Sequence, residues 1–239
     1  MQKTMKKHDR ILVISDLHAP YCHVDSISFL EKLKKKYNPT TIINIGDEAS
    51  YNSIHFHEID PDLASAGDEL EVTKSWLHRL EKLFPNMVIL ESNHGSMVLR
   101  RAIAKGMSRK FIKSYNDILE VNDGWIWKDK HQIEYEGKKI LFGHQFSKNI
   151  EKAVREYSQC VVQGHFHCCA TTVFVANEFH LNWGMTVGCL VNKDSLAMAY
   201  MKINLAKPIL SCGIITEGYP HIVPMVLNKS GSWDKNIYI

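Results

Sequence analysis

The chain has 239 residues, 45% of them hydrophobic, which suits one large globular domain or two small ones. Its 29 basic and 26 acidic residues leave a net charge of +3, too small to indicate a nucleic-acid partner, and no apolar run is long enough to span a bilayer. The first residues lack the apolar core of a signal peptide. Six cysteines without Cys-x-x-Cys spacing predict neither disulfides nor a zinc knuckle, so we expect a soluble cytoplasmic protein with no membrane contact.

Strands and helices alternate along the first half of the chain. Short apolar runs that stop at polar residues predict strands, and apolar residues that recur every three or four positions predict helices. In chain order the predicted elements are a strand within 10–18, a helix at 26–37, a strand within 40–48, a long loop, a helix at about 66–84, a strand within 86–94, and two short helices at 97–106 and 110–119.

The pattern becomes richer in strands from about Gly124 onward. Residues 125–145 suggest two strands joined by a tight hairpin at "EGKK". They are followed by a helix at about 148–157, a strand from 160, and antiparallel strands within 171–184 and 195–205. Because the chain shows no internal repeat and no linker, the economical prediction is a single α/β domain over residues 1–239.

Residue types that bind metal ions follow five of the predicted strands. They are Asp16 and His18, Asp47, Asn93 and His94, His144, and His165 and His167. If the segment that carries the last two histidines stays extended, both point to the same side. Loops at the carboxyl ends of parallel strands converge at one edge of a sheet, so we expect these side chains to meet. The alternative is a chance series of unrelated surface loops.

This set of ligands is larger than one tetrahedral zinc site can hold. It suits two divalent ions about 3.5–4 Å apart that share one carboxylate. Nitrogen and oxygen ligands without thiolate favour manganese, with iron, zinc, nickel or cobalt as alternatives, whereas magnesium is less natural beside so many histidines. Cys168 and Cys169 are interpreted as packing residues rather than as ligands.

Five short motifs carry a resemblance to a known family. "SDLH", "NIGDE", "SNHG", "FGHQ" and "QGHFH" are similar, in order, to the D-x-H, G-D, G-N-H, H and G-H-x-H motifs of the calcineurin-like metallophosphoesterase superfamily. The resemblance covers about residues 11–170. It implies a four-layer α/β/β/α sandwich with a dinuclear metal centre at one edge, in which the strands of 171–239 complete the second sheet.

The resemblance also implies a role for each matching residue. The first ion would be held by Asp16, His18 and His167, the second by Asn93, His144 and His165, and both by Asp47. His94 matches the histidine that contacts the phosphate in the family and can protonate the leaving oxygen. A water activated between the two ions would attack the phosphorus atom.

Three positions depart from the family pattern. Ser92 replaces the glycine of G-N-H, Gly95 replaces the acidic residue that commonly follows it, and Gln145 stands where a glycine is common. In relatives the acidic residue can orient the catalytic histidine. Glu48 or Asp68 is the candidate substitute for it in this chain.

The substrate is predicted from the loop "ASYNSIHFHEIDPDLASAGDE", which resembles a loop of small phage-encoded members, among them deoxynucleoside 5′-monophosphatases. The predicted activity is hydrolysis of (deoxy)nucleoside 5′-monophosphates, in the host cytoplasm if the chain is phage-encoded. His55 and His57 would contact the base and Arg100 the phosphate, unless they only pack the loop and line a solvated helix face. The alternatives are a nuclease or cyclic-nucleotide phosphodiesterase of the same fold, or a non-catalytic metal-binding scaffold. Nucleic acid is not the favoured partner, and the oligomeric state is left open.

Overall fold

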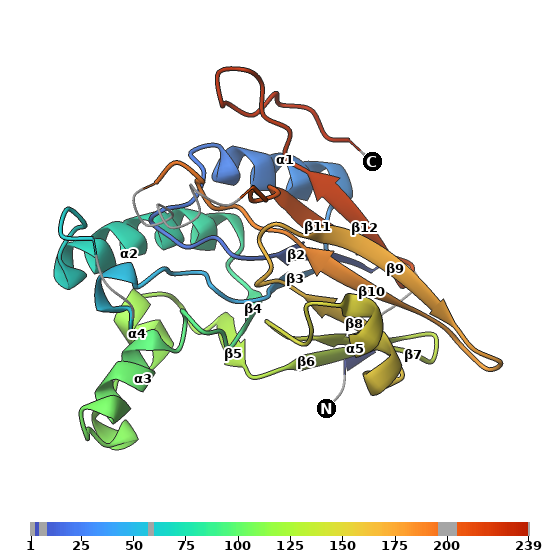
Figure 1. The fold of residues 1–239 in the computed structure, drawn as a ribbon, viewed down its shortest axis with the longest axis horizontal. Helices are drawn as coiled ribbons and strands as arrows, with labels where there is room; N and C mark the ends of the chain where they lie inside the picture. The colour runs from blue at the N-terminus through green and yellow to red at the C-terminus, as the bar shows by residue number, and fades with distance from the viewer. Residues whose placement is uncertain (1–2, 5–8, 57–59, 196–204, 239) are drawn as a thin grey trace.

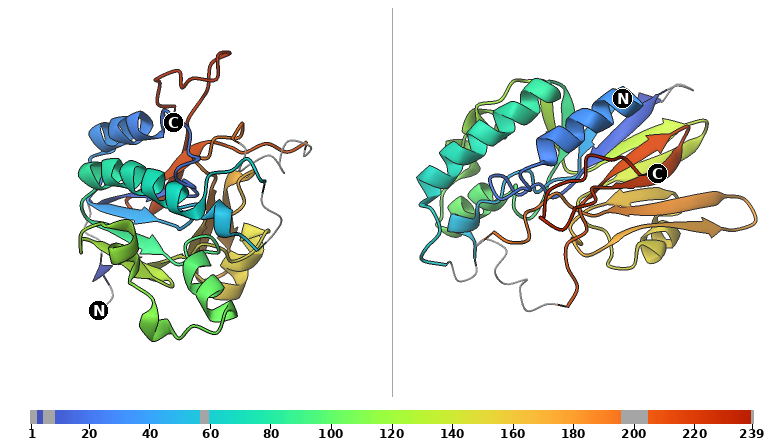
Figure 2. Two further views of the ribbon diagram at one scale, coloured as in Figure 1. Left: turned by 90° about the vertical axis from the view of Figure 1, so that its left-hand side faces the viewer. Right: turned by 90° about the horizontal axis from the view of Figure 1, so that it is seen from above.

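Two six-stranded sheets form the centre of the structure, a computed structural model that describes residues 3–4, 9–56, 60–195 and 205–238. Within these residues the sheets pack face to face, and helices cover their outer faces (Figure 1 and Figure 2). The predicted four-layer α/β/β/α sandwich of a single domain is therefore confirmed. No helix of the described part of the chain is both long and apolar enough to cross a membrane.

The first sheet has the strand order β12-β11-β2-β3-β4-β5. Its strands are β2 (Arg10–Ile14), β3 (Thr41–Asn44), β4 (Met87–Leu90), β5 (Trp125–Lys128), β11 (Ser211–Thr216) and β12 (Tyr219–Pro224). The strands from β2 to β5 are parallel, and β11 joins β2 in antiparallel register. The carboxyl ends of β2, β3 and β4 consequently lie at one edge.

The second sheet has the strand order β1-β6-β7-β8-β10-β9. Its strands are β1 (Lys3–Thr4), β6 (His131–Tyr135), β7 (Lys138–Phe142), β8 (Cys160–Gln163), β9 (Ala170–Ala176) and β10 (Leu181–Val187). β7, β8 and β10 run parallel, and β9 is antiparallel to β10. β6 is antiparallel to β7 and parallel to β1.

Five helices and two short 3-10 turns accompany the sheets in the described part of the chain. They are α1 (Ser26–Tyr37), α2 (Ala66–Leu83), α3 (Met97–Ala104), α4 (Tyr115–Leu119) and α5 (Ile150–Tyr157), with the 3-10 turns η1 (Asn52–Ile54) and η2 (Arg109–Phe111). Residues of α1 and α2 share one apolar cluster with the outer face of the first sheet, and α5 packs against the second sheet.

The alternation of side chains along a strand divides the core into layers. In β2, Ile11 and Val13 belong to the cluster between the two sheets, whereas Leu12 and Ile14 belong to the cluster beneath the helices. All four side chains are fully buried. Successive residues of a strand point to opposite faces, so a strand covered on both sides reads as a continuous apolar run. This explains why apolar and polar residues do not alternate in the sequence of β2.

Three predictions about elements were wrong. Residues 125–145 form three strands and not two, because β5 belongs to the first sheet and buries Trp125 beneath the helices. The helix expected at 110–119 is a 3-10 turn followed by α4, whose first turn is capped by Ser114. The strands of 171–239 were expected to complete the second sheet; β9 and β10 do so, but β11 and β12 extend the first.

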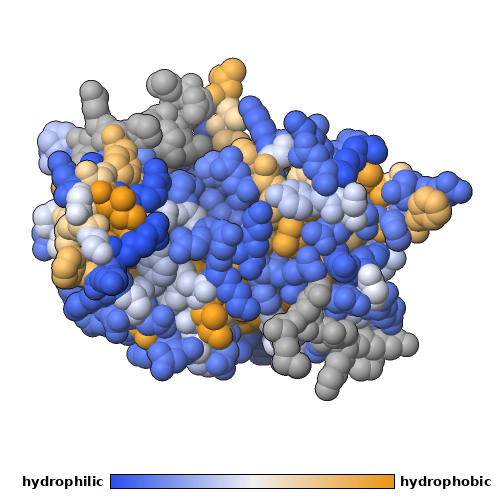
Figure 3. All heavy atoms as spheres, turned by 90° about the horizontal axis from the view of Figure 1, so that it is seen from below, coloured by the Kyte–Doolittle hydropathy of each residue, from blue (hydrophilic) through white to orange (hydrophobic). Residues whose placement is uncertain are grey.

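The strand expected within 195–205 lies largely outside the described residues. In the view from below, the surface is mostly hydrophilic, and hydrophobic side chains gather at the end where Figure 1 places α3 (Figure 3). Exposed apolar residues of this region include Ile103, Met107 and Phe111.

Candidate metal centre

The loops that follow five strands bring the predicted ligands together at one edge of the sandwich. Two groups of side chains have ligand atoms that all lie within 4.8 Å of one another. One consists of Asp16, His18, Asp47 and His167, and the other consists of Asp47, His144 and His165. Asp47 belongs to both groups, so its carboxylate lies where a bridging ligand would be.

Short distances define the first group. The Nε2 atom of His167 lies 3.1 Å from Oδ1 of Asp16 and 3.1 Å from Nε2 of His18. Nε2 of His18 is 3.5 Å from Oδ2 of Asp47. The second oxygen of Asp16 accepts hydrogen bonds from the Ser15 hydroxyl and, at 2.9 Å, from the backbone N–H of His165. These bonds fix the carboxylate with Oδ1 turned toward the imidazoles.

The second group includes an amide oxygen. Nε2 of His144 lies 2.7 Å from Oδ1 of Asn93, 3.4 Å from Oδ2 of Asp47 and 3.2 Å from Nδ1 of His165. The other ring nitrogen of His144 donates a hydrogen bond to the carbonyl oxygen of Ile45 at 3.0 Å. Since Nδ1 carries the proton, Nε2 presents a lone pair.

The residues present fit divalent cations. The lone pair of His144 faces a carboxylate oxygen and an amide oxygen, and two imidazole nitrogens of the first group approach each other to 3.1 Å. Electron-rich atoms that converge without a donor repel one another unless a cation lies between them. Imidazole, carboxylate and amide ligands without thiolate suit borderline divalent ions. Each group is therefore a candidate site for one ion.

The backbone at this edge adopts an uncommon conformation. Asp16, His18, Asp47 and His165 all have positive φ angles, between 50° and 66°. Non-glycine residues rarely occupy this left-handed region, although Asp and His tolerate it better than most, and such residues concentrate at functional sites. Because the chain turns at His165, the two histidines after β8 do not share an extended segment. That premise was wrong, and each imidazole enters a different group.

Electrostatics keeps both carboxylates ionised. Burial by itself would raise the pKa of Asp16, but the hydrogen bond from His167 and the electrostatic interaction with the neighbouring imidazoles outweigh it and lower the pKa. Asp47 is also fully buried, and the neighbouring His144, His94 and His18 lower its pKa to about 2. Burial lowers the pKa of His18 and of His165, which favours the neutral form of these two imidazoles, whereas the hydrogen bond and charge of Asp16 outweigh burial and raise the pKa of His167.

The backbone carbonyl of Ser50 orients His94. Nδ1 of His94 donates to this oxygen at 2.5 Å, and the backbone N–H of His94 donates to Oδ1 of Asp47 at 3.0 Å. The predicted substitutes do not take this role. Asp68 bonds to Ser65 at the start of α2, and neither carboxylate oxygen of Glu48 has a hydrogen-bond partner among the described residues.

Two of the departures from the family pattern depend on each other. The hydroxyl of Ser92 accepts hydrogen bonds from the backbone N–H groups of Asp47, at 2.8 Å, and Gly95, at 3.0 Å. A Cβ atom at position 95 would lie 2.8 Å from that hydroxyl. Glycine is also needed at position 46, where φ is +104°, because a Cβ atom added there would lie 2.5 Å from the Cβ of Ser92. Serine at 92 therefore requires glycine at 95.

Glu48 is buried without a partner of normal geometry. Its side chain is 1% exposed, and a Cβ at Gly95 would meet one of its oxygens at 3.3 Å. Burial, together with the charge of Asp47, raises the pKa of Glu48 to about 7, and the nearby Trp127 indole lowers it slightly. The Nε1 atom of Trp127 is likewise buried without a hydrogen-bond partner in the described part of the chain.

The loop after β3 forms a rim beside His94. The carboxylate of Glu69, buried in α2, accepts the backbone N–H groups of Asn52 and Ser53 at 2.8 Å each and so anchors η1. The imidazole of His55 lies 5.2 Å from that of His94, centroid to centroid, at an angle of 35°. His57, which was also predicted to contact the substrate, lies outside the described residues.

Arginines of α3 hold this rim. The guanidinium of Arg100 lies 5.1 Å from the centre of the Phe56 ring and donates to the carbonyl oxygen of Asn93 at 3.1 Å. The guanidinium of Arg101 lies 4.3 Å from the same ring and donates to the carbonyl oxygens of Ile54 and His55. Arg100 is thus tied to the candidate centre through the backbone of a predicted ligand. The Phe56 ring itself is 44% exposed.

A protein-family model matches most of this chain. The model described as calcineurin-like phosphoesterase matches residues 9–169, which is more than half of the chain. The chain therefore belongs to the calcineurin-like phosphoesterase family. Membership in this family indicates a metal-dependent hydrolase of phosphoric esters, and the two candidate ion groups agree with it.

Three solved structures are similar to this chain at low sequence identity. Vps29 from Chaetomium thermophilum is 10% identical, with a TM-score of 0.50, and the match covers 98% of this chain and 95% of that one. Wild-type Vps29 from Entamoeba histolytica, complexed with Zn²⁺, is 13% identical, with a TM-score of 0.49 and coverage of 96% of each chain. An archaeal phosphodiesterase is 15% identical, with a TM-score of 0.46, and the match covers 90% of this chain and 99% of that one. No match was found among curated proteins.

Sequence reasoning missed the residues that position the site. The Ser50 carbonyl has no signature in the sequence, because every residue carries the same backbone oxygen. Glu69 is preceded by Ser65 and Asp68, a capping pattern that marks the start of a helix but does not reveal a buried carboxylate. The serine and glycine at positions 92 and 95 were noticed as departures, and only the structure shows that they compensate for each other.

Proposed function

We propose that this chain is a two-metal phosphoesterase and that its ligands are those implied by the family motifs. One ion would be bound by Asp16, His18 and His167, the other by Asn93, His144 and His165, and Asp47 would bridge them. The observation that carries the proposal is the position of Asp47, whose carboxylate is common to both groups. Divalent ions held there would supply a nucleophilic water at neutral pH and positive charge for the phosphate oxygens.

His94 is the proposed general acid. Its Nδ1–H group is held by the Ser50 carbonyl, so the imidazolium form presents its Nε2–H group to the substrate. When the phosphorus–oxygen bond breaks, the Nε2 proton passes to the leaving oxygen and a neutral imidazole remains, still bonded to Ser50. The proposal is supported by the ring of His94, which lies 4.6 Å from that of His18, centroid to centroid, next to the first group.

The proposed substrate is a (deoxy)nucleoside 5′-monophosphate. Support comes from the rim of His55 and Phe56, whose rings offer stacking surfaces next to His94. Arg100 and Arg101 add positive charge on the same rim, which favours an anionic substrate. We further propose manganese as the ion and the cytoplasm as the location, where the six free cysteines would persist as thiols.

A substrate panel tests this proposal. Protein loaded with Mn²⁺ is assayed with p-nitrophenyl phosphate, its bis-p-nitrophenyl diester, deoxynucleoside and ribonucleoside 5′-monophosphates, cyclic nucleotides and single-stranded DNA. We expect the monoesters to be hydrolysed, and the nucleoside monophosphates with the highest kcat/KM. Preference for the cyclic nucleotides would identify a cyclic-nucleotide phosphodiesterase, and cleavage of DNA a nuclease. Metal binding without turnover of any substrate would identify a non-catalytic scaffold.

A further inference from the structure

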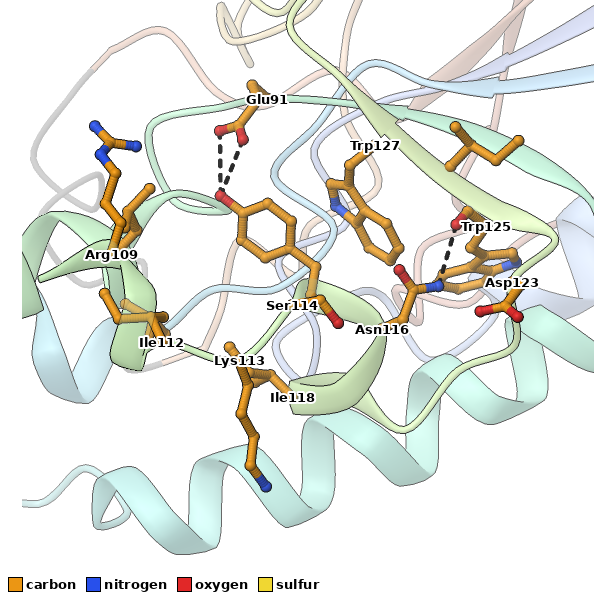
Figure 4. Close-up of a pocket in the computed structure, with 14 residues that line it drawn as sticks. Glu91, Arg109, Ile112, Lys113, Ser114, Asn116, Ile118, Asp123, Trp125 and Trp127 are labelled. Carbon is orange, nitrogen blue, oxygen red and sulfur yellow. Dashed lines mark hydrogen bonds between the residues drawn. The ribbon is translucent and has the colours of Figure 1, made fainter.

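A cavity separate from the metal centre lies between β5 and the segment from α3 to α4. Its volume is about 480 Å³, which is large enough for a small organic ligand. The walls include Glu91, Arg109, Tyr115, Asn116 and Trp127 (Figure 4). None of the candidate metal ligands lines it. Exposed apolar residues gather on the same segment, at the α3 end of the molecule (Figure 3).

Aromatic rings form one wall of the cavity. The rings of Tyr115 and Trp127 lie 5.5 Å apart, centroid to centroid, with an angle of 33° between their planes, and Trp125 lies behind at 6.2 Å from Trp127. Trp125 is fully buried, and its indole N–H donates to the carbonyl oxygen of Phe84 at 2.9 Å. Trp125 also lines the cavity and supports Trp127 from behind, so Tyr115 and Trp127 offer a surface on which a planar group can stack.

A carboxylate is fixed at the end of this wall. The hydroxyl of Tyr115 donates to both oxygens of Glu91, at 3.0 and 3.2 Å (Figure 4). Burial, together with the charge of Glu91, raises the pKa of Tyr115, so the hydroxyl stays protonated and keeps this role as donor. One shared hydrogen leaves each carboxylate oxygen with a free lone pair. Glu91 therefore offers two acceptors side by side, at the edge of the aromatic surface.

We propose that this cavity binds a guanine base, presented by a guanosine nucleoside or nucleotide. The ring system would stack on Tyr115 and Trp127, while its N1–H and N2–H groups donate to the two oxygens of Glu91. Guanine is the common base with two adjacent N–H donors on its pairing edge; adenine, cytosine and uracil each place an acceptor beside their donor. Arg109 lies on the same side of the cavity as Glu91 and would attract the phosphate of a nucleotide (Figure 4).

The cavity does not depend on the metal ions, so its ligand can be tested without them. Protein treated with EDTA is titrated with guanosine, which carries no phosphate, by isothermal titration calorimetry. The same titration is made with inosine, which lacks the N2 amino group, and with cytidine. We expect one guanosine per chain, with inosine bound about tenfold more weakly and cytidine more weakly still. Equal binding of guanosine and inosine, or no binding of guanosine, would overturn the proposal.

A variant pair tests the role of Glu91. Glu91→Gln keeps the shape of the side chain but replaces one acceptor oxygen with an N–H₂ donor, so guanosine should bind about tenfold more weakly while inosine changes less. Asp129→Asn removes one charge at an exposed position outside the cavity and should leave both affinities unchanged. A guanosine affinity that Glu91→Gln leaves unchanged would contradict the assignment. Failure of this test leaves the phosphatase assay untouched, because that assay depends on the metal centre.

Discussion

Replacing Glu48 by glutamine should stabilise the metal-free protein in a pH-dependent way. In the folded chain, burial and the charge of Asp47 raise the pKa of Glu48 from 4.5 to about 7. At about 1.4 kcal/mol for each pH unit, this corresponds to a destabilisation of about 3 kcal/mol when the carboxyl is ionised. Because the folded-state pKa is the higher one, the penalty is absent below pH 4.5, grows as the pH rises, and is complete above pH 7.

The assay is urea unfolding followed by tryptophan fluorescence, in EDTA, for the wild-type protein and Glu48→Gln. The free energy of unfolding of Glu48→Gln minus that of the wild-type protein should rise by about 2 kcal/mol between about pH 5 and about pH 8. The rise is smaller than the full penalty because part of that penalty is already present at pH 5. Glu31→Gln, at an exposed position of α1, controls for the loss of one carboxylate and should show a much smaller shift. A difference for Glu48→Gln that is independent of pH would refute the reasoning.

Three further outcomes are expected. His94→Ala should retain both metal ions but lose about 10²–10⁴-fold in turnover, and the loss should be larger for substrates with poor leaving groups than for those with good ones. Equal losses on both kinds of substrate would argue against the role of His94 as the acid. Gly95→Ala should lower the free energy of unfolding, measured in urea titrations, by about 1–3 kcal/mol, because the added Cβ displaces the Ser92 hydroxyl from two hydrogen bonds. The control, Gly67→Ala in the first turn of α2, should be neutral or slightly stabilising. Saturating Mn²⁺ should raise the thermal unfolding midpoint, by the equivalent of about 3 kcal/mol at a hundredfold excess over Kd, and an unchanged midpoint would speak against a folded metal site.

The convergence of the candidate ligands was predictable because it follows from strand polarity. β2, β3 and β4 are parallel, so Asp16 and Asp47 had to emerge at the same edge once their strands were recognised. The apolar runs that predicted these strands are short and end abruptly at polar residues. Local sequence therefore determined both the fold class and the place of the site.

The orientation of individual side chains was not predictable in the same way. His165 turns to a φ of 66° after β8, which sends it toward His144 while His167 reaches Asp16. An alternation rule for strands cannot foresee a left-handed residue. The orienting partner of His94 is a backbone oxygen, at Ser50, and its position depends on how Glu69 of α2 anchors the loop.

The assignment of strands to sheets was the other part that sequence patterns left undetermined. β5 and β6 are separated by only Asp129 and Lys130, yet they belong to different sheets. β11 follows the strands of the second sheet in the sequence, yet it belongs to the first sheet, where it pairs with β2. Pairing of this kind is decided by packing between distant segments, and residue patterns within one segment carry little information about it.

The most direct measurement of the central claim is the number of metal ions bound per chain. Protein dialysed to equilibrium against Mn²⁺, Zn²⁺ or Fe²⁺ is analysed for its metal content, beside Asp47→Ala as the variant that removes the shared carboxylate. The account predicts two ions for the wild-type chain and a clear loss at both positions for the variant, with the fold retained by circular dichroism. A wild-type chain that binds no ion, or a variant that still binds two, would contradict it.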